Sequence, residues 1–216
     1  MKKNPGQNLQ ESDKELIALI NQGSEAAFED FVTKYESMIF GFGMKVCGNT
    51  EDAKDIMQET FLKAFRSIKR LKSADALKTW LYRIATNACL IKRRRGKFEP
   101  DKVLSLNELR PSKDEISHSF ISGIHMQPDE AMIQKELADT IRRSILSVPS
   151  KYRVVLILRD MEGFSAEEAA RILNLPISTI KIRLHRARLS FKKYLEKQFR
   201  RKKGTRNEKV QRPRKM

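Results

Sequence analysis

Three acidic side chains between Asp52 and Glu59 are the residues whose type and spacing most clearly suggest chemistry. Apolar residues recur over residues 52–68 at about 100° per residue, which predicts an amphipathic helix. Asp52, Asp55 and Glu59 fall on the side opposite its apolar stripe. No histidine lies near them in the sequence, which speaks against a metal site or a hydrolytic centre. The pattern instead predicts an acidic surface that suits a basic partner.

This predicted helix also carries one apolar residue, Leu62, on its charged side, close to Arg66. An acidic, solvated face with a single stray leucine is one interpretation, because isolated exposed apolar residues are common. A partner surface, with an apolar anchor inside a polar ring, is the other. The expected buried face comprises Ala53, Met57, Thr60, Phe61, Ala64 and Ile68, with Ile56 and Phe65 at its margins.

Residues 55–65, with the sequence DIMQETFLKAF, resemble the helix with which small bacterial sigma factors of the extracytoplasmic-function type bind RNA polymerase. The resemblance implies an alternative sigma factor, which binds core polymerase and directs it to promoters by recognising −10 and −35 elements. It further implies that Asp55, Gln58 and Glu59 contact the largest polymerase subunit, with Leu62 at the buried centre of the contact.

A second segment, residues 77–87 with the sequence LKTWLYRIATN, resembles the part of the same family that melts and reads the upstream edge of the transcription bubble. The resemblance implies that residues 73–77 form a loop for a flipped base of the −10 element. Extruding a base costs a few kcal/mol, which a polar pocket and phosphate contacts can offset. A core helix with a basic, solvated end is the alternative. The implied −10 contacts are Ser73, Asp75, Arg83, Asn87, Lys92, Arg93 and Arg94, while Leu77 and Ile91 depart from the usual family residues.

A helix-turn-helix motif is evident between residues 165 and 198 without reference to any family. Ser165 and Glu168 form a capping box, which starts a short helix. Asn174 tolerates the left-handed turn that follows, and Pro176 suits the first turn of the next helix. The second helix has a buried stripe that comprises Ile180, Leu184, Ala187, Phe191 and Leu195, opposite a basic face. Such a helix, after a capped helix and a short turn, is typical of major-groove binding.

Residues 179–188, TIKIRLHRAR, resemble the sigma-factor helix that reads the −35 element. The DNA-contacting residues predicted on this helix are Ser178, Thr179, Lys181, Ile182, Arg183 and Arg186, of which Ile182 replaces a residue that is usually small and polar. Two further helices, over residues 136–146 and 152–158, are expected to form the core of this domain. Their predicted buried residues are Ile145, Leu146, Val154, Val155 and Leu158.

Composition and charge define the organisation of the 216 residues, of which 40% are hydrophobic. The formal net charge is +17, and residues 197–216 hold ten of the basic residues against one glutamate. Such a run attracts polyanions without sequence specificity, and it can also be a mere solubility tail. We therefore predict an all-α protein with two helical domains joined by a flexible linker. The expected segments are a flexible N-terminus at 1–12, a sigma region 2-like bundle at 13–95, the linker at 96–133, a sigma region 4-like domain at 134–198 and a basic disordered tail at 199–216.

The sequence contains no apolar run typical of a membrane span or a secretory signal. We therefore expect a cytoplasmic protein without direct membrane insertion, which an anti-sigma partner could hold at the membrane. Cys47 and Cys89 are interpreted as buried, reduced thiols. We predict neither a metal nor a cofactor, because His118, His125 and His185 lack the spacing of a metal site.

Three functions compete at this point. A sigma factor would open promoters only together with core polymerase, and the family implies contacts to the largest subunit, the flap of the second-largest subunit, promoter DNA and an anti-sigma protein. A free-standing helix-turn-helix regulator would bind duplex DNA alone, usually as a dimer on a palindrome. A nuclease or recombinase would need clustered carboxylates for metal or an activated nucleophile, and neither is evident.

Overall fold

A computed structural model describes the backbone of residues 5–71, 73–95 and 128–210 and the side chains of residues 12–71, 73–92 and 136–199. Every regular element in these ranges is helical, which confirms the predicted all-α class. The elements are α1 (Pro5–Asn21), α2 (Glu25–Cys47), α3 (Thr50–Ser67), the 3-10 turns η1 (Ile68–Arg70) and η2 (Ala74–Ala76), α4 (Leu77–Arg95), α5 (Pro128–Ser147), α6 (Ser150–Leu156), a π-helical turn (Ile157–Met161), α7 (Ala166–Leu173) and α8 (Ile177–Val210).

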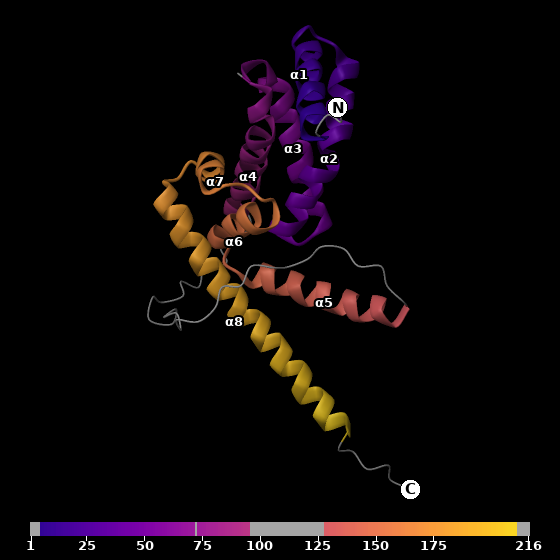
Figure 1. Cartoon of the computed structure of the whole chain (residues 1–216), viewed down its shortest axis with the longest axis vertical. Coiled ribbons are helices and arrows are strands. Elements are labelled where there is room, and N and C mark those ends of the chain that lie inside the picture. The colour runs from indigo at the N-terminus through magenta and orange to yellow at the C-terminus, as the bar shows by residue number, and fades with distance from the viewer. Residues whose placement is uncertain (1–4, 72, 96–127, 211–216) are drawn as a thin grey trace.

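Helices α1 to α4 form the first helical body, in which α3 packs against both α2 and α4 (Figure 1). Phe31, Ile39 and Phe42 of α2 are fully buried at its centre. Phe61 of α3 meets Phe31 edge to face, with ring centroids 6.0 Å apart. Burying such side chains contributes roughly 1.5–3 kcal/mol each, so burial of the inner face of α3 is a main source of its attachment to the bundle.

Helix α3 begins where the sequence predicts a break. Gly48 has φ 85°, a left-handed conformation that glycine adopts without strain, and its N–H donates to the Met44 carbonyl at 2.9 Å. The Asn49 side chain then accepts the N–H of Asp52 at 2.8 Å. This cap fixes the direction in which α3 leaves the turn, and with it the direction of the α3 acidic side chains.

Helices α5 to α8 form the second body, and the long α8 extends away from it toward the C-terminus (Figure 1). Its core joins Val155 of α6 to Ile180 and Leu184 of α8. Of the core residues predicted here, Ile145, Val154, Val155 and Leu158 are buried, and Leu146 is half-buried.

The two bodies pack against each other, with α7 on α4 and with α5 and α6 on α2. The Tyr82 ring of α4 meets the Phe164 ring at 4.8 Å, and its hydroxyl donates to the Glu162 carboxylate at 2.5 Å. Glu162 also pairs with Lys45 of α2 at 2.6 Å. Burial, followed by the bond to Glu162, raises the pKa of the Tyr82 hydroxyl far above its ordinary value, so this residue stays protonated as a donor.

Three helix ends differ from the expected positions. Helix α1 starts at Pro5 instead of near residue 12, and α5 starts at Pro128 instead of near residue 134. Proline is well suited to a first helical turn, because its missing N–H would have no partner there. Helix α8 continues to Val210, past the expected end at residue 198. Residues 199–210 are rich in arginine and lysine, which favour helices, and this outweighs one glycine. Residues 1–4, 211–216 and most of the predicted linker lie outside the described residues.

The start of α7 and the turn between α7 and α8 confirm both local predictions. Ser165 and Glu168 form the capping box, with Ser165 N–H donating to the Glu168 carboxylate at 2.7 Å. That backbone bond is the main reason that the pKa of Glu168 lies below its usual value. Asn174 has φ 51° and ψ 52°, in the left-handed region.

Replacing Asn174 with alanine is expected to destabilise the helix-turn-helix by about 1 kcal/mol, because a Cβ-bearing residue without a local polar partner is disfavoured there. Asn174→Gly, which removes the steric cost, should remain within about 0.5 kcal/mol of the parent protein. Urea unfolding followed by circular dichroism measures both differences. Equal stability of the two variants would contradict this account of the turn.

Candidate functional site

The outer face of α3 presents acidic residues to solvent around one apolar side chain. Asp55, Gln58 and Glu59 are exposed, and Leu62 is 55% exposed. The predicted outward position of Leu62 is therefore confirmed. Glu59 pairs with Lys63 at 2.9 Å along the same helix, an exposed contact of the kind that contributes little to stability. The four outward residues together define the α3 acidic face.

Phe65 enlarges the apolar part of this face. The sequence placed Phe65 at the margin of the buried stripe, but its side chain is 61% exposed. Its ring contacts only the edge of the bundle, at Phe28, with centroids 5.0 Å apart. Leu62 and Phe65 stand three residues apart, a spacing that places them side by side on a helix. That spacing was the available signal for a wider apolar patch than Leu62 alone.

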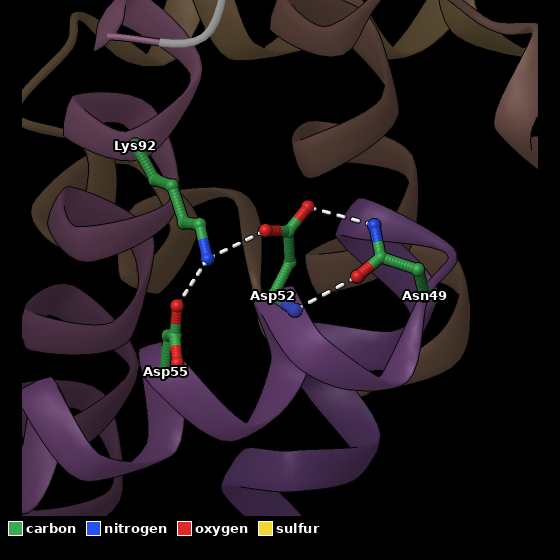
Figure 2. Close-up of polar contacts among 4 residues, drawn as sticks. All are labelled: Asn49, Asp52, Asp55 and Lys92. Carbon is green, nitrogen blue, oxygen red and sulfur yellow. Dashed lines mark hydrogen bonds and ion pairs between the residues drawn. The ribbon is translucent and has the colours of Figure 1, made fainter.

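Lys92, which the sequence predicts as a DNA contact, forms ion pairs with Asp52 and Asp55 of α3 in the isolated protein. Figure 2 shows its side chain reaching from α4 to two carboxylates of α3. The Lys92 ammonium lies 2.5 Å from an Asp52 oxygen and 2.5 Å from an Asp55 oxygen. The bond to Asp52, and after it the bond to Asp55, raises the pKa of Lys92. The bond to Lys92, and after it the bond to the Asn49 amide, lowers the pKa of Asp52. The packing of α4 across α3 brings these groups together, and local sequence patterns do not reveal that packing.

The other predicted −10 contacts are divided between a turn and one helix face. Ser73 and Asp75 are exposed, and the Asp75 N–H donates to the Ser73 hydroxyl at 3.2 Å, which shapes the turn before α4. Arg83 and Asn87 are exposed on the same side of α4, four residues apart. Leu77, the last residue of the expected loop, is only 1% exposed and belongs to the core. The side chains of Arg93 and Arg94 lie outside the described residues.

The first turns of α8 carry the six residues expected to contact DNA, of which three are exposed. Ser178, Lys181 and Ile182 are exposed, whereas Thr179, Arg183 and Arg186 are half-buried. The inner side of these turns is anchored by Ile180, Leu184 and Ala187, all buried as predicted. The helix therefore presents a mixed polar and basic surface on a rigid base.

The side chain of Arg186 makes a polar contact with α6 that the sequence did not reveal. Its guanidinium donates to the Tyr152 hydroxyl of α6 at 3.3 Å. Two residues further along α8, Arg188 makes a bidentate pair with Asp160, at 2.8 and 2.7 Å. Both arginines reach residues more than twenty positions away, which explains why helical periodicity gave no signal for these contacts.

The described residues offer no group of three or more His, Cys, Asp and Glu side chains that could hold a metal ion. In the same residues, no helix combines the length and apolarity needed to cross a membrane. The chemistry that the α3 and α8 surfaces can support is association, through charge complementarity on α3 and through hydrogen bonding to a polyanion on α8.

Comparison with known proteins assigns each body to a family. Residues 31–99 match the family model described as sigma-70 region 2, and residues 138–190 match the model of sigma-70, region 4. The chain is 35% identical over 182 residues to the extracytoplasmic-function (ECF) RNA polymerase sigma factor SigW of Bacillus subtilis, an alignment that covers 84% of this chain and 96% of SigW. It is 31% identical over 195 residues to the RNA polymerase sigma-H factor of Pseudomonas aeruginosa, covering 87% of this chain and 95% of that protein.

Solved structures show the same fold. CnrH in complex with the cytosolic domain of CnrY matches with a TM-score of 0.58 and 20% identity, over 86% of this chain and 97% of CnrH. The sigma factor RpoE of Bartonella quintana, in complex with the anti-sigma factor NepR, matches with a TM-score of 0.54 and 23% identity, over 78% of this chain and 96% of RpoE.

Proposed function

Because this chain belongs to the extracytoplasmic-function sigma factors of the sigma-70 family, we propose that the α3 acidic face binds core polymerase and that α4 and α8 read promoter DNA. The protein is an alternative sigma factor, which binds core RNA polymerase and directs promoter-specific initiation of transcription. Sigma factors are non-catalytic initiation factors. A free-standing helix-turn-helix regulator is not favoured, since a region 2 domain precedes the region 4 domain.

The observation that carries the polymerase assignment is the exposed Leu62 within the α3 acidic face. An apolar side chain that is 55% exposed among carboxylates has the composition of an interface centre with a polar rim. Asp55, Gln58 and Glu59 would supply charge and hydrogen bonds to a basic surface on the largest polymerase subunit. Phe65 would add apolar area beside Leu62.

For the DNA, we propose that region 2, spanning residues 13–95, reads the −10 element and that region 4, spanning residues 134–198, reads the −35 element. Arg83 and Asn87 on one face of α4 would contact the unpaired −10 strand, and the turn at Ser73 and Asp75 would border the flipped base. The exposed start of α8 would enter the major groove, where arginine and lysine contact guanine edges or phosphates.

Further partners are proposed by analogy. The flap of the second-largest polymerase subunit would hold region 4. An anti-sigma protein would bind this factor and hold it inactive; among the similar structures, RpoE is in complex with the anti-sigma factor NepR. We place the activity in the bacterial cytoplasm, where core polymerase works, and propose that such an inhibitor can hold the protein at the membrane.

Two sets of variants should separate the polymerase surface from the DNA surface. Exchanging Asp55 and Glu59 for lysine is expected to weaken core polymerase binding about tenfold, because like charges would face each other. The same exchange should leave the thermal unfolding midpoint within a few degrees. Binding of fluorescent protein to core polymerase, followed by anisotropy, measures the loss. Unchanged affinity would exclude this face as the polymerase contact.

Arg186→Ala is expected to spare core polymerase binding and to weaken holoenzyme binding to duplex −35 DNA by about 1–3 kcal/mol. Tyr152→Phe is the matched control, since it removes only the hydroxyl that Arg186 contacts at 3.3 Å. A small effect of Tyr152→Phe beside a large effect of Arg186→Ala would identify Arg186 as a DNA contact. Equal effects would mean that Arg186 acts through its hydrogen bond to Tyr152 of α6.

A further inference from the structure

Lys92 connects the two surfaces to which different partners are assigned. It projects from the last two turns of α4, the helix that carries Arg83 and Asn87, and it ends between Asp52 and Asp55 of α3 (Figure 2). Asp55 belongs to the α3 acidic face. A single cation of the DNA-reading helix is therefore bound by a carboxylate of the polymerase-binding face.

In this geometry the two carboxylates neutralise the charge of Lys92 and occupy two of its hydrogen-bond donors. An ammonium group has three N–H donors, and two acceptors lie at 2.5 Å. Two carboxylates beside one ammonium also leave a local net negative charge. In this arrangement Lys92 offers little attraction to a DNA phosphate, because the neighbouring carboxylates would repel that phosphate.

The same contacts are open enough to be exchanged. The Asp55 side chain is 64% exposed, and those of Lys92 and Asp52 are 34% and 35% exposed. Ion pairs at this exposure are weak, and other charged groups can displace one of the partners. A basic partner that approaches the α3 acidic face meets Asp55 from the solvent side and competes directly with Lys92 for it.

We propose that Asp52 and Asp55 withhold Lys92 from DNA in the isolated factor, and that core polymerase, by taking Asp55, leaves Lys92 with one carboxylate partner and makes it available to a DNA phosphate. This inference rests on the proposed function of the α3 acidic face. Lys92 then acts as an internal competitor for polymerase and as a conditional DNA contact. Binding of polymerase and binding of DNA are thereby coupled through one side chain, with the reciprocity that linkage requires.

The first test uses the full-length chain without polymerase. The probe is a fluorescent oligo(dT) of about 15 nucleotides, which reports backbone contacts without sequence preference. Lys92→Met should change its affinity by less than about 1.5-fold in the parent protein, because a withheld lysine contributes no counterion release. In the D52N/D55N background, the same Lys92→Met change should weaken binding about threefold or more.

Lys14→Met is the charge-matched control, since Lys14 is exposed on the distant helix α1. Its effect should be equal in the two backgrounds. Equal effects of Lys92→Met in both backgrounds would overturn the proposal. Equally large effects would mean that Lys92 already contacts DNA in the parent protein, and no effect in either background would mean that it never does. Thermal unfolding of each variant checks that the changes leave the fold intact.

The second test measures binding to core polymerase. Removing an internal competitor should tighten the binding of Lys92→Met about twofold to fivefold, and Asp55→Asn should abolish that gain. Weaker or unchanged binding of Lys92→Met, with the parent protein bound normally, would overturn the release of Lys92 by polymerase. Failure of the parent protein itself to bind would contradict the proposed function instead, so the two failures are distinguishable.

Discussion

Leu62→Asp is expected to lower the affinity of the protein for core RNA polymerase by about 30-fold or more, the loss typical of a central interface residue. Leu62 is 55% exposed and stands beside the exposed Phe65, so an apolar partner surface must cover it for the α3 acidic face to be an interface. An aspartate there would remain hydrated in the isolated protein but would carry an uncompensated charge into the contact. The loss should therefore exceed that from reversing the charges at the rim.

The measurement is a titration of core polymerase into fluorescent protein, with Leu19→Asp as the matched control. Leu19 is 47% exposed and lies on α1, outside both the α3 acidic face and region 4. Both variants remove an exposed leucine and add the same charge. Equal losses would mean that the effect is a general one of charge, and the assignment of Leu62 as the anchor would be wrong.

Arg153→Met is expected to have the largest effect on stability, with a loss of about 2–4 kcal/mol. Arg153 is only 7% exposed and its guanidinium donates to three backbone carbonyls. One carbonyl is at Leu146 in the last turn of α5, one is at Val148 just after α5, and the third is at Val46 of α2, at 2.7 Å. Methionine fills much of the same volume but leaves these carbonyls without the donor. The change would loosen the turn between α5 and α6 together with the contact between the two helical bodies.

Differential scanning calorimetry should show this loss as a lower unfolding midpoint, by about 4–16 °C for a chain of this size. Arg153→Lys keeps the positive charge and some of the N–H donors. Its unfolding midpoint should lie between those of Arg153→Met and the parent protein. Arg143→Met, at an exposed position of α5, should stay close to the parent. A midpoint for Arg153→Met equal to that of Arg143→Met would refute the role of Arg153 in joining the two bodies.

The parts of the fold that the sequence predicted are those set by local rules. The outward Leu62 follows from helical periodicity. The start of α7 follows from a capping box, and the turn at Asn174 follows from a residue tolerant of the left-handed region and a proline. Each of these signals lies within a few residues of the feature it predicts. Local steric and hydrogen-bonding preferences are sufficient there, because tertiary packing agrees with them.

The contacts that the sequence did not predict join distant residues. Lys92 meets Asp55 across 37 positions, and Tyr82 meets Glu162 across 80. Nothing in the periodicity of either helix indicates which charged residue lies opposite. Lys92 therefore looked like one more cation in a basic helix end, although the packing of α4 on α3 makes it a partner of the acidic face. The sequence also predicted Phe65 at the margin of the buried stripe, whereas its ring meets Phe28 and is otherwise largely exposed. Which residues of α2 lie opposite Phe65 is again a matter of packing between distant residues.

The most direct test of the central claim is transcription by sigma-free bacterial core polymerase on a library of genomic promoters, with and without the purified protein. We predict discrete transcription starts only when both components are present, each preceded by two shared motifs near −10 and −35. Absence of such starts, together with tight duplex binding by the protein alone, would contradict the account and favour a free-standing DNA-binding regulator.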